Sequence, residues 1–150
     1  RREEVTTEGG LALTSPGSRE RLRPVVERLA GAGIRTSLFI DPSDDALEAS
    51  AELGVAAVEF HTGEYANARD ARGRTRELDR LARAAGRGRE LGLDVHAGHG
   101  LTYENVTPVA AIQEIEELNI GHSVISRAIF TGMQAAVAEM ASILRRARRP

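Results

Sequence analysis

The four histidines of the sequence lie in or just after short apolar runs, where the catalytic side chains of α/β enzymes often gather. His61 ends one run and His96 lies inside another. His99 and His122 each follow a run and stand beside glycine. An imidazole exchanges protons near neutral pH. This pattern indicates general acid–base chemistry at one edge of a sheet.

His99 is the better catalytic candidate, because Gly98 and Gly100 on either side free the backbone and let a substrate approach. Glu59 is an acidic residue inside an apolar strand, where a carboxylate must be paired or used. Two plainer interpretations stay open. A strand histidine can be a structural hydrogen-bonding residue, and Glu59 can form a buried salt bridge with an arginine.

Gly121 and His122 follow the last apolar run and open a helical segment. Free backbone N–H groups and the positive end of a helix bind phosphate in barrel enzymes, although a simple capping turn has the same residues. Together with the glycines around His99, they predict a phosphorylated small molecule at one rim. A divalent metal on Glu59, His61, His96 or His99 is a weaker alternative, because no tight histidine pair supports it.

The elements that must position these residues alternate between strand-like and helical patterns. The expected strands are 36–40, 56–61, 93–97 and 118–120. The expected helices are 19–32, 44–53, 75–91, 108–118 with Thr107 as N-cap, and 123–146 with a break at Gly132, while 67–74 is expected to form a mobile loop.

Composition limits the function classes. The 150 residues suffice for one domain with a core, and the formal net charge of −2 argues against nucleic-acid binding. The chain has no cysteine, and all 20 basic residues are arginine, so neither a thiolate nor a lysine Schiff base is possible within it. No apolar run is long enough for a membrane span. We therefore expect a cytoplasmic protein without membrane association.

One helix followed by four β-α units predicts an α/β fold. A complete (β/α)₈ barrel needs about 250 residues, so the chain would supply roughly half of one. An open four-stranded α/β sheet would bury the same runs, and connection patterns alone do not separate the two folds.

Five motifs together resemble the pyridoxine 5′-phosphate synthase family. They are EVTTEGG (4–10), SLFID (37–41), EFHTGEYA (59–66), AGHGLTY (97–103) and LNIGH (118–122). They occur in the order of that family and cover essentially the whole chain. Five motifs in order are far more specific than any one of them.

The resemblance implies that residues 1–150 are a single partial domain, the last four β-α units of a TIM (β/α)₈ barrel whose N-terminal half is absent. The family's enzymes are transferases of vitamin B6 biosynthesis. They condense 3-amino-2-oxopropyl phosphate with 1-deoxy-D-xylulose 5-phosphate and use no metal or organic cofactor. The family assembles into homo-oligomers, and a fragment alone is expected to be inactive.

The resemblance also implies residue roles. His99 would be the proton donor, and Glu59 would stabilise charge in the transition state. Thr6 would contact deoxyxylulose phosphate, whereas Gly100, Gly121 and His122 would contact aminooxopropyl phosphate.

Two other functions remain open at this point. One is a barrel that resembles a metal-dependent sugar-phosphate epimerase, and the other is a non-catalytic half-barrel that serves as an association module.

Overall fold

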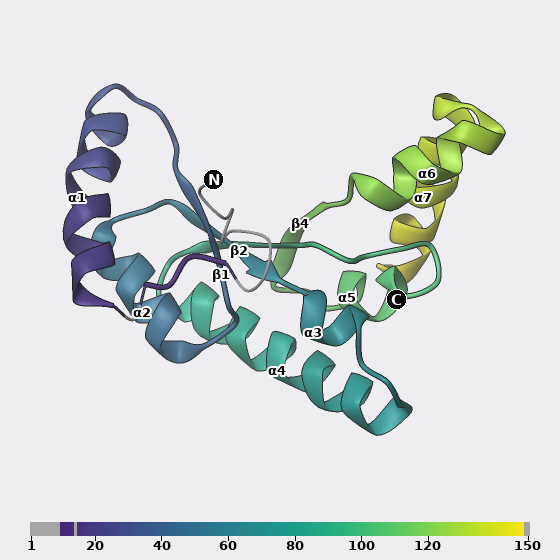
Figure 1. Cartoon of the computed structure of the whole chain (residues 1–150), viewed down its shortest axis with the longest axis horizontal. Helices are drawn as coiled ribbons and strands as arrows, with labels where there is room; N and C mark the ends of the chain where they lie inside the picture. The colour runs from purple at the N-terminus through teal and green to yellow at the C-terminus, as the bar shows by residue number, and fades with distance from the viewer. Residues whose placement is uncertain (1–9, 14, 149–150) are drawn as a thin grey trace, which may run out of the picture.

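A wholly parallel sheet lies at the centre of the computed structural model, which describes residues 10–13 and 15–148 (Figure 1). Its strands in this described part are β1 (Ser37–Ile40), β2 (Ala57–His61), β3 (Asp94–Gly98) and β4 (Ile115–Asn119), and they pair in the order β1-β2-β3-β4. An open doubly wound sheet reverses its strand order at a switch point, and this sheet does not. Its order is that of consecutive strands in a (β/α)₈ barrel, so the α/β prediction is confirmed.

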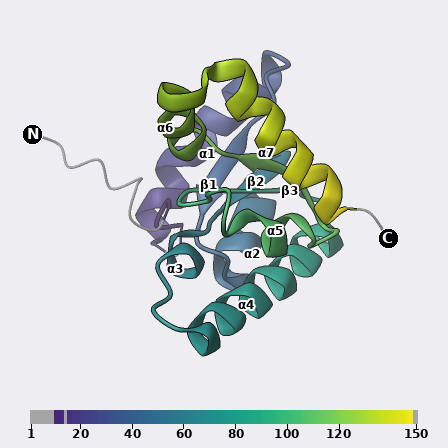
Figure 2. The same ribbon diagram turned by 90° about the vertical axis from the view of Figure 1, so that its right-hand side faces the viewer.

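A row of helices covers one face of the sheet. α1 packs on α2, α2 on α4, α4 on α5, and α5 on α7, as Figures 1 and 2 show. The helices of the described residues are α1 (Pro16–Gly31), α2 (Asp44–Leu53), α3 (Gly63–Ala66), α4 (Ala71–Glu90), α5 (Val106–Ala110), α6 (His122–Thr131) and α7 (Met133–Ala147).

The two faces of the sheet differ in polarity because side chains alternate along each strand. The face under the helices is buried and apolar. It carries a row of strand neighbours formed by Leu38, Val58, Val95 and Ile115. On the opposite face, the corresponding row of strand neighbours is half-buried or exposed and consists of Phe39, Glu59, His96 and Glu117. Glu59 and His96 therefore lie on the face opposite this row of helices.

The segment 67–74, predicted as a mobile loop, is partly helical. Asp70 caps α4, because its Oδ1 accepts a hydrogen bond of 2.7 Å from the Gly73 N–H. The helix therefore begins at Ala71, four residues before the predicted start at 75. The short helix α3, which the sequence pattern missed, precedes it.

The helix predicted at 108–118 is wrong over most of its length. The observed α5 begins after Asn105 rather than Thr107 and ends at Ala110, and β4 begins at Ile115. The register with β3 shifts at this point: Val95 pairs with Ile115 and His96 pairs with Glu117, so Glu116 is an extra residue. This β-bulge gives the apolar residues of β4 a three-residue spacing, which resembles a helical period.

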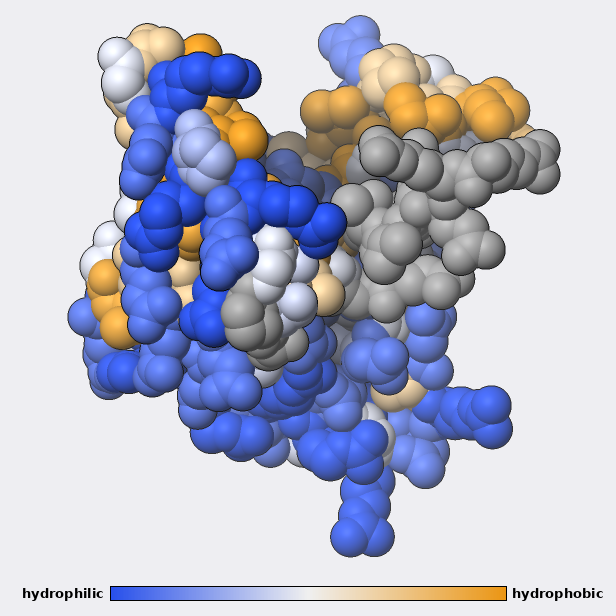
Figure 3. Space-filling view, turned by 60° about the vertical axis from the view of Figure 1, so that its left-hand side comes forward, coloured by the Kyte–Doolittle hydropathy of each residue, from blue (hydrophilic) through white to orange (hydrophobic). Residues whose placement is uncertain are grey.

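The predicted break at Gly132 is confirmed, since α6 ends there and α7 begins at Met133. α6 packs on α7 but has no buried residue of its own. Large apolar side chains are exposed on this pair, including Ile129 and Phe130. Figure 3 shows that hydrophobic surface gathers on the upper part of the molecule, whereas the lower part, where α4 lies, is hydrophilic. Across residues 10–13 and 15–148, every helix is too short or too polar to cross a membrane.

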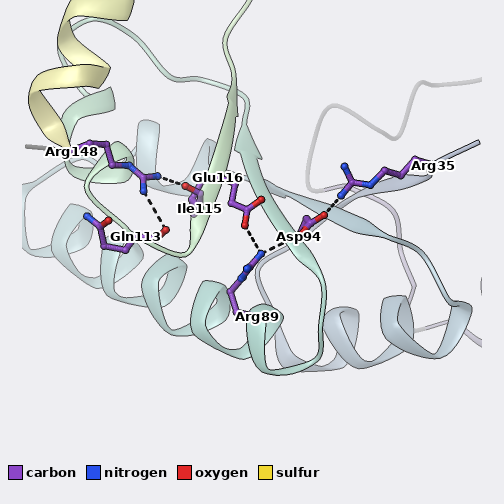
Figure 4. A network of polar contacts seen from close by, with 7 residues as sticks. All are labelled: Arg35, Arg89, Asp94, Gln113, Ile115, Glu116 and Arg148. Carbon is purple, nitrogen blue, oxygen red and sulfur yellow. Dashed lines mark hydrogen bonds and ion pairs between the residues drawn. The ribbon is translucent and has the colours of Figure 1, made fainter.

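Polar contacts join the elements at the amino end of the sheet (Figure 4). Asp94, at the start of β3, pairs with Arg35 and with Arg89 of α4, and Arg89 also contacts Glu116 at 2.5 Å. Arg148, after α7, donates to the carbonyl oxygens of Gln113 and Ile115. In α/β barrels this end serves stability, whereas the opposite end serves function.

Candidate active site

A cleft of about 950 Å³ opens at the carboxyl ends of the strands. The end of β4, the loops that follow β3 and β4, and α6 form most of its walls, and Phe39 of β1 and Glu59 of β2 also line it. Five residues predicted from the sequence line this cleft together: Glu59, His99, Gly100, Gly121 and His122. The sixth predicted site residue, Thr6, lies outside the described residues.

The other two histidines do not line the cleft, but both lie close to residues that do. His61 ends β2, is buried, and stacks on His99. His96 is half-buried on β3 and pairs in register with Glu59.

Glu59 lies in the middle of β2 with its carboxylate directed across β3 towards β4. Its Oε2 accepts a hydrogen bond of 2.9 Å from Nδ2 of Asn119, at the end of β4. Between them lies Gly98 of β3, where a Cβ atom would collide with Oε1 of Glu59. Burial raises the pKa of the Glu59 carboxyl, and the bond from Asn119 and the charge of His96 offset part of this rise. The carboxylate is thus held in one direction.

His99 follows β3 and is exposed to the cleft. Its backbone φ is 76°, in the left-handed region that few residues other than glycine adopt. Its ring stacks on that of His61 with centroids 4.7 Å apart and an interplanar angle of 29°. The imidazole is therefore available to a ligand on one face and supported on the other.

Asn105 holds the loop that follows His99. Its Oδ1 accepts a hydrogen bond of 2.7 Å from the Thr102 N–H, and its Nδ2 donates to the Gly100 carbonyl at 3.0 Å. The buried Tyr65 of α3 donates its hydroxyl to the Asn105 carbonyl at 2.7 Å. These bonds fix the cleft wall between β3 and α5.

Gly121 and His122 lie at the amino end of α6, as predicted. This end carries free N–H groups and a partial positive charge, which together attract an anion. The hydroxyl of Ser123 donates to the Leu101 carbonyl at 2.8 Å, which fastens the start of α6 to the loop after β3. The two loops therefore form one continuous rim.

Among the polar residues of the cleft that sequence reasoning missed are Asn119 and Arg127. Arg127 lies over the ring of Tyr103 at 5.2 Å and forms a two-pronged pair with Glu139 at 2.6 and 3.0 Å. Because arginine is frequent in the chain, the sequence pattern did not single out Arg127. Asn119 lies inside the predicted strand 118–120, and that position gave no sign of a site residue.

The geometry does not bring metal ligands together. His61 and His99 meet face to face as stacked rings, which does not direct two nitrogens at a shared ion. Within residues 10–13 and 15–148, no three side chains among His, Cys, Asp and Glu converge as ligands of one ion. What the cleft offers instead is an imidazole, a carboxylate and a helix end around one space, a set suited to proton transfer on an anionic ligand.

Comparison with known proteins gives matches of two kinds, to a family model and to individual proteins. A family model described as "Pyridoxal phosphate biosynthesis protein PdxJ" matches residues 1–146. The protein named "Pyridoxine 5'-phosphate synthase" from Magnetococcus marinus (strain ATCC BAA-1437 / JCM 17883 / MC-1) is 50% identical over 147 residues. This match covers 98% of the chain and 60% of that relative.

Proposed function

The chain belongs to the PdxJ family of pyridoxal phosphate biosynthesis proteins, and from this premise we propose that it carries part of the active site of a pyridoxine 5′-phosphate synthase. The proposed reaction condenses 3-amino-2-oxopropyl phosphate with 1-deoxy-D-xylulose 5-phosphate. One observation carries the proposal: Glu59, His99 and the Gly121–His122 turn line a single cleft at the carboxyl ends of the strands.

In the proposed reaction the substrate amine attacks the substrate ketone, and loss of water from the resulting carbinolamine gives an imine. The leaving hydroxyl needs a proton, and His99 is the proposed donor because its imidazole borders the cleft. The imine nitrogen carries positive charge as water leaves. Glu59 stabilises that charge, since its carboxylate is held at the same cleft by Asn119. No lysine is needed, because the imine joins the two substrates.

The two phosphates need positive or donating groups, and the amino end of α6 is the proposed site for one of them. Gly121 and His122 supply backbone N–H groups there, and Gly100 borders the same space. Thr6 is proposed to contact deoxyxylulose phosphate. Binding of the two phosphates would hold the amine and the ketone that react near His99 and Glu59.

Two further features belong to the proposal. We propose a cytoplasmic location, as expected for a biosynthetic enzyme of this family. We also propose a homo-oligomer, supported by exposed apolar side chains such as Ile129 on α6. Sedimentation velocity at several concentrations tests the second feature, and a species of constant monomer mass would contradict it.

A chimera tests the proposed reaction. This chain replaces the matching 60% of the Magnetococcus relative, and formation of pyridoxine 5′-phosphate from the two substrates is measured beside the unaltered relative. We expect turnover by the chimera and a fall of about 10²- to 10⁴-fold in kcat for His99→Ala. A folded chimera without turnover, or one whose kcat is unchanged by His99→Ala, would refute the proposal. The chain by itself is assayed in parallel, and we expect little or no turnover from it.

A further inference from the structure

The backbone of His99 is in an unfavourable conformation that its neighbours must maintain. Among the described residues it is the one non-glycine with a positive φ, at 76°. Histidine adopts this conformation more readily than most residues, but it still needs support. Such outliers gather at functional sites because surrounding contacts hold them in place. The support for His99 comes from β2 and the residue after it.

Thr62 binds the peptide groups on both sides of His99. Its N–H donates to the Gly98 carbonyl at 2.9 Å. Its hydroxyl lies 2.8 Å from the same oxygen and 2.5 Å from the His99 carbonyl oxygen, so one proton is shared between two acceptors. The Thr62 side chain is fully buried, so water does not compete for these bonds. Rotation about the His99 backbone would break them.

His61, the residue before Thr62, supports the His99 ring. The two rings stack at 4.7 Å, and Phe39 meets His61 edge-on at a centroid distance of 5.5 Å. Gly63 completes the arrangement, because a Cβ atom there would collide with the His61 ring. Residues 61–63 therefore hold His99 at its backbone through Thr62 and at its ring through His61.

We propose that Thr62 is a positioning residue, whose hydroxyl holds the His99 backbone in the conformation that directs its imidazole into the cleft. The catalytic part of this inference rests on the proposed function of His99. The structural part does not, because it concerns only the orientation of the ring. The competing explanation is that Thr62 merely ties β2 to β3.

Two substitutions at position 62 separate these explanations. Thr62→Val keeps the shape and removes the hydroxyl, whereas Thr62→Ser keeps the hydroxyl and removes the methyl group. Ser50→Ala is the matched control, because Ser50 is also fully buried and donates a 2.7 Å hydrogen bond to the Ala46 carbonyl, but within α2. Thr62→Ala replaces Thr62→Val if the latter does not fold.

The first measurement is the NMR spectrum of the histidine side chains in the chain itself, with His99→Asn to assign the His99 signals. Stacking on His61 shifts the His99 ring protons from their free positions. We expect Thr62→Val to move these signals towards the free positions, and Thr62→Ser and Ser50→Ala to leave them unchanged. Unmoved signals in Thr62→Val would overturn the proposal.

The second measurement is turnover in the chimera described above. We expect Thr62→Val to lower kcat by about 10²-fold with KM little changed, since misplacement of a catalytic group by about 1 Å has this effect. Thr62→Ser should restore kcat, and Ser50→Ala should retain it despite lower stability. Equal kcat losses in Thr62→Val and Ser50→Ala would show a merely structural role. If Thr62→Val moves the His99 signals but the unsubstituted chimera has no turnover, the proposed function is refuted and the positioning role stands.

Discussion

At the scale of single residues, Glu59 illustrates a conflict between burial and charge. Burial raises the pKa of its carboxyl, so the folded state binds a proton more tightly than the unfolded state does. The stability from this proton is fully present below the unfolded pKa and is lost as the pH rises through the higher folded pKa. Above the folded pKa the ionised carboxylate therefore lowers the free energy of unfolding. Such a cost is expected where a charge is kept for function.

Glu59→Gln is expected to stabilise the fold and slow the reaction. Its amide oxygen can still accept the hydrogen bond from Asn119, but the buried charge is gone. The gain in stability should be larger at pH 7 than at pH 4, though small, because solvent screens a half-buried group. In the chimera kcat should fall about 10²- to 10³-fold. Urea unfolding at both pH values checks the first part, and an equal difference at the two would contradict it.

Asn119→Ala should change the pH dependence of turnover. The hydrogen bond from Asn119 lowers the pKa of Glu59, so its loss lets that pKa rise further. Because the proposed reaction uses the ionised carboxylate, the acidic limb of the kcat profile should move to higher pH. Asn67→Ala, at an exposed asparagine that ends α3, is the control and should leave the limb in place. If the acidic limb does not move in Asn119→Ala, the pKa of Glu59 does not determine the position of that limb.

Some site residues could be predicted from local sequence, and others could not. His99 between two glycines and Glu59 in an apolar strand conflict with their surroundings, so the sequence alone indicates them. Asn119 and Thr62 carry no such conflict. Asn119 matters because the register sets it beside Gly98, and Thr62 because β3 ends next to it. Their positions depend on strand pairing, which a local pattern does not encode.

At the scale of elements, three of the four strands agree with the predicted runs, and β4 does not. A buried parallel strand with a regular pleat shows its apolar residues in a continuous or alternating run. The bulge at Glu116 breaks that alternation. Ile115 and Leu118 therefore both point to the buried side of the sheet although they are three residues apart. The sequence therefore indicated a longer helix 108–118. Only the pairing with β3 distinguishes the two interpretations.

The packing of α4 on β3 gives a matched pair of substitutions. A Cβ atom at Gly88 would lie 2.8 Å from Cγ2 of Val95 and 3.4 Å from Cδ2 of Leu47, whereas one at Gly86 would meet nothing within 4 Å. Gly88→Ala should therefore destabilise the fold by about 1–3 kcal/mol through overpacking. Gly86→Ala should stabilise it by about 0.5–1 kcal/mol, since alanine favours the helix. Urea unfolding measures both, and effects of the same sign would contradict this packing.

At the scale of the whole molecule, the two ends of the sheet have different tasks. The carboxyl ends carry the cleft with His99, and the amino ends carry the ion pairs around Asp94 (Figure 4). The alternation of strands and helices predicted an α/β fold but allowed an open sheet or part of a barrel. Connections in sequence do not specify which strands pair. The order β1-β2-β3-β4, with its helices in a row on one face, favours the barrel arrangement.

This division of tasks predicts that changes at the amino end alter stability without altering the chemistry. Arg148 joins the end of α7 to the Gln113 and Ile115 carbonyls before β4, across a large separation in sequence. Arg148→Ala should lower the free energy of unfolding by about 1 kcal/mol, because a charged group donates these bonds. Arg146→Ala is the matched control, since the side chain of Arg146 donates a hydrogen bond to Ser142 of its own helix rather than to the segment before β4.

Thermal unfolding of both variants measures the difference, and hydrogen exchange in α7 locates it. We expect faster exchange at the end of α7 in Arg148→Ala, little change in Arg146→Ala, and unchanged kcat in chimeras that carry either substitution. Equal stability in the two variants would mean that the arginine bonds to Gln113 and Ile115 do not hold α7 against the sheet. A loss of kcat in Arg148→Ala at a temperature where it is fully folded would mean that the two ends of the sheet are coupled.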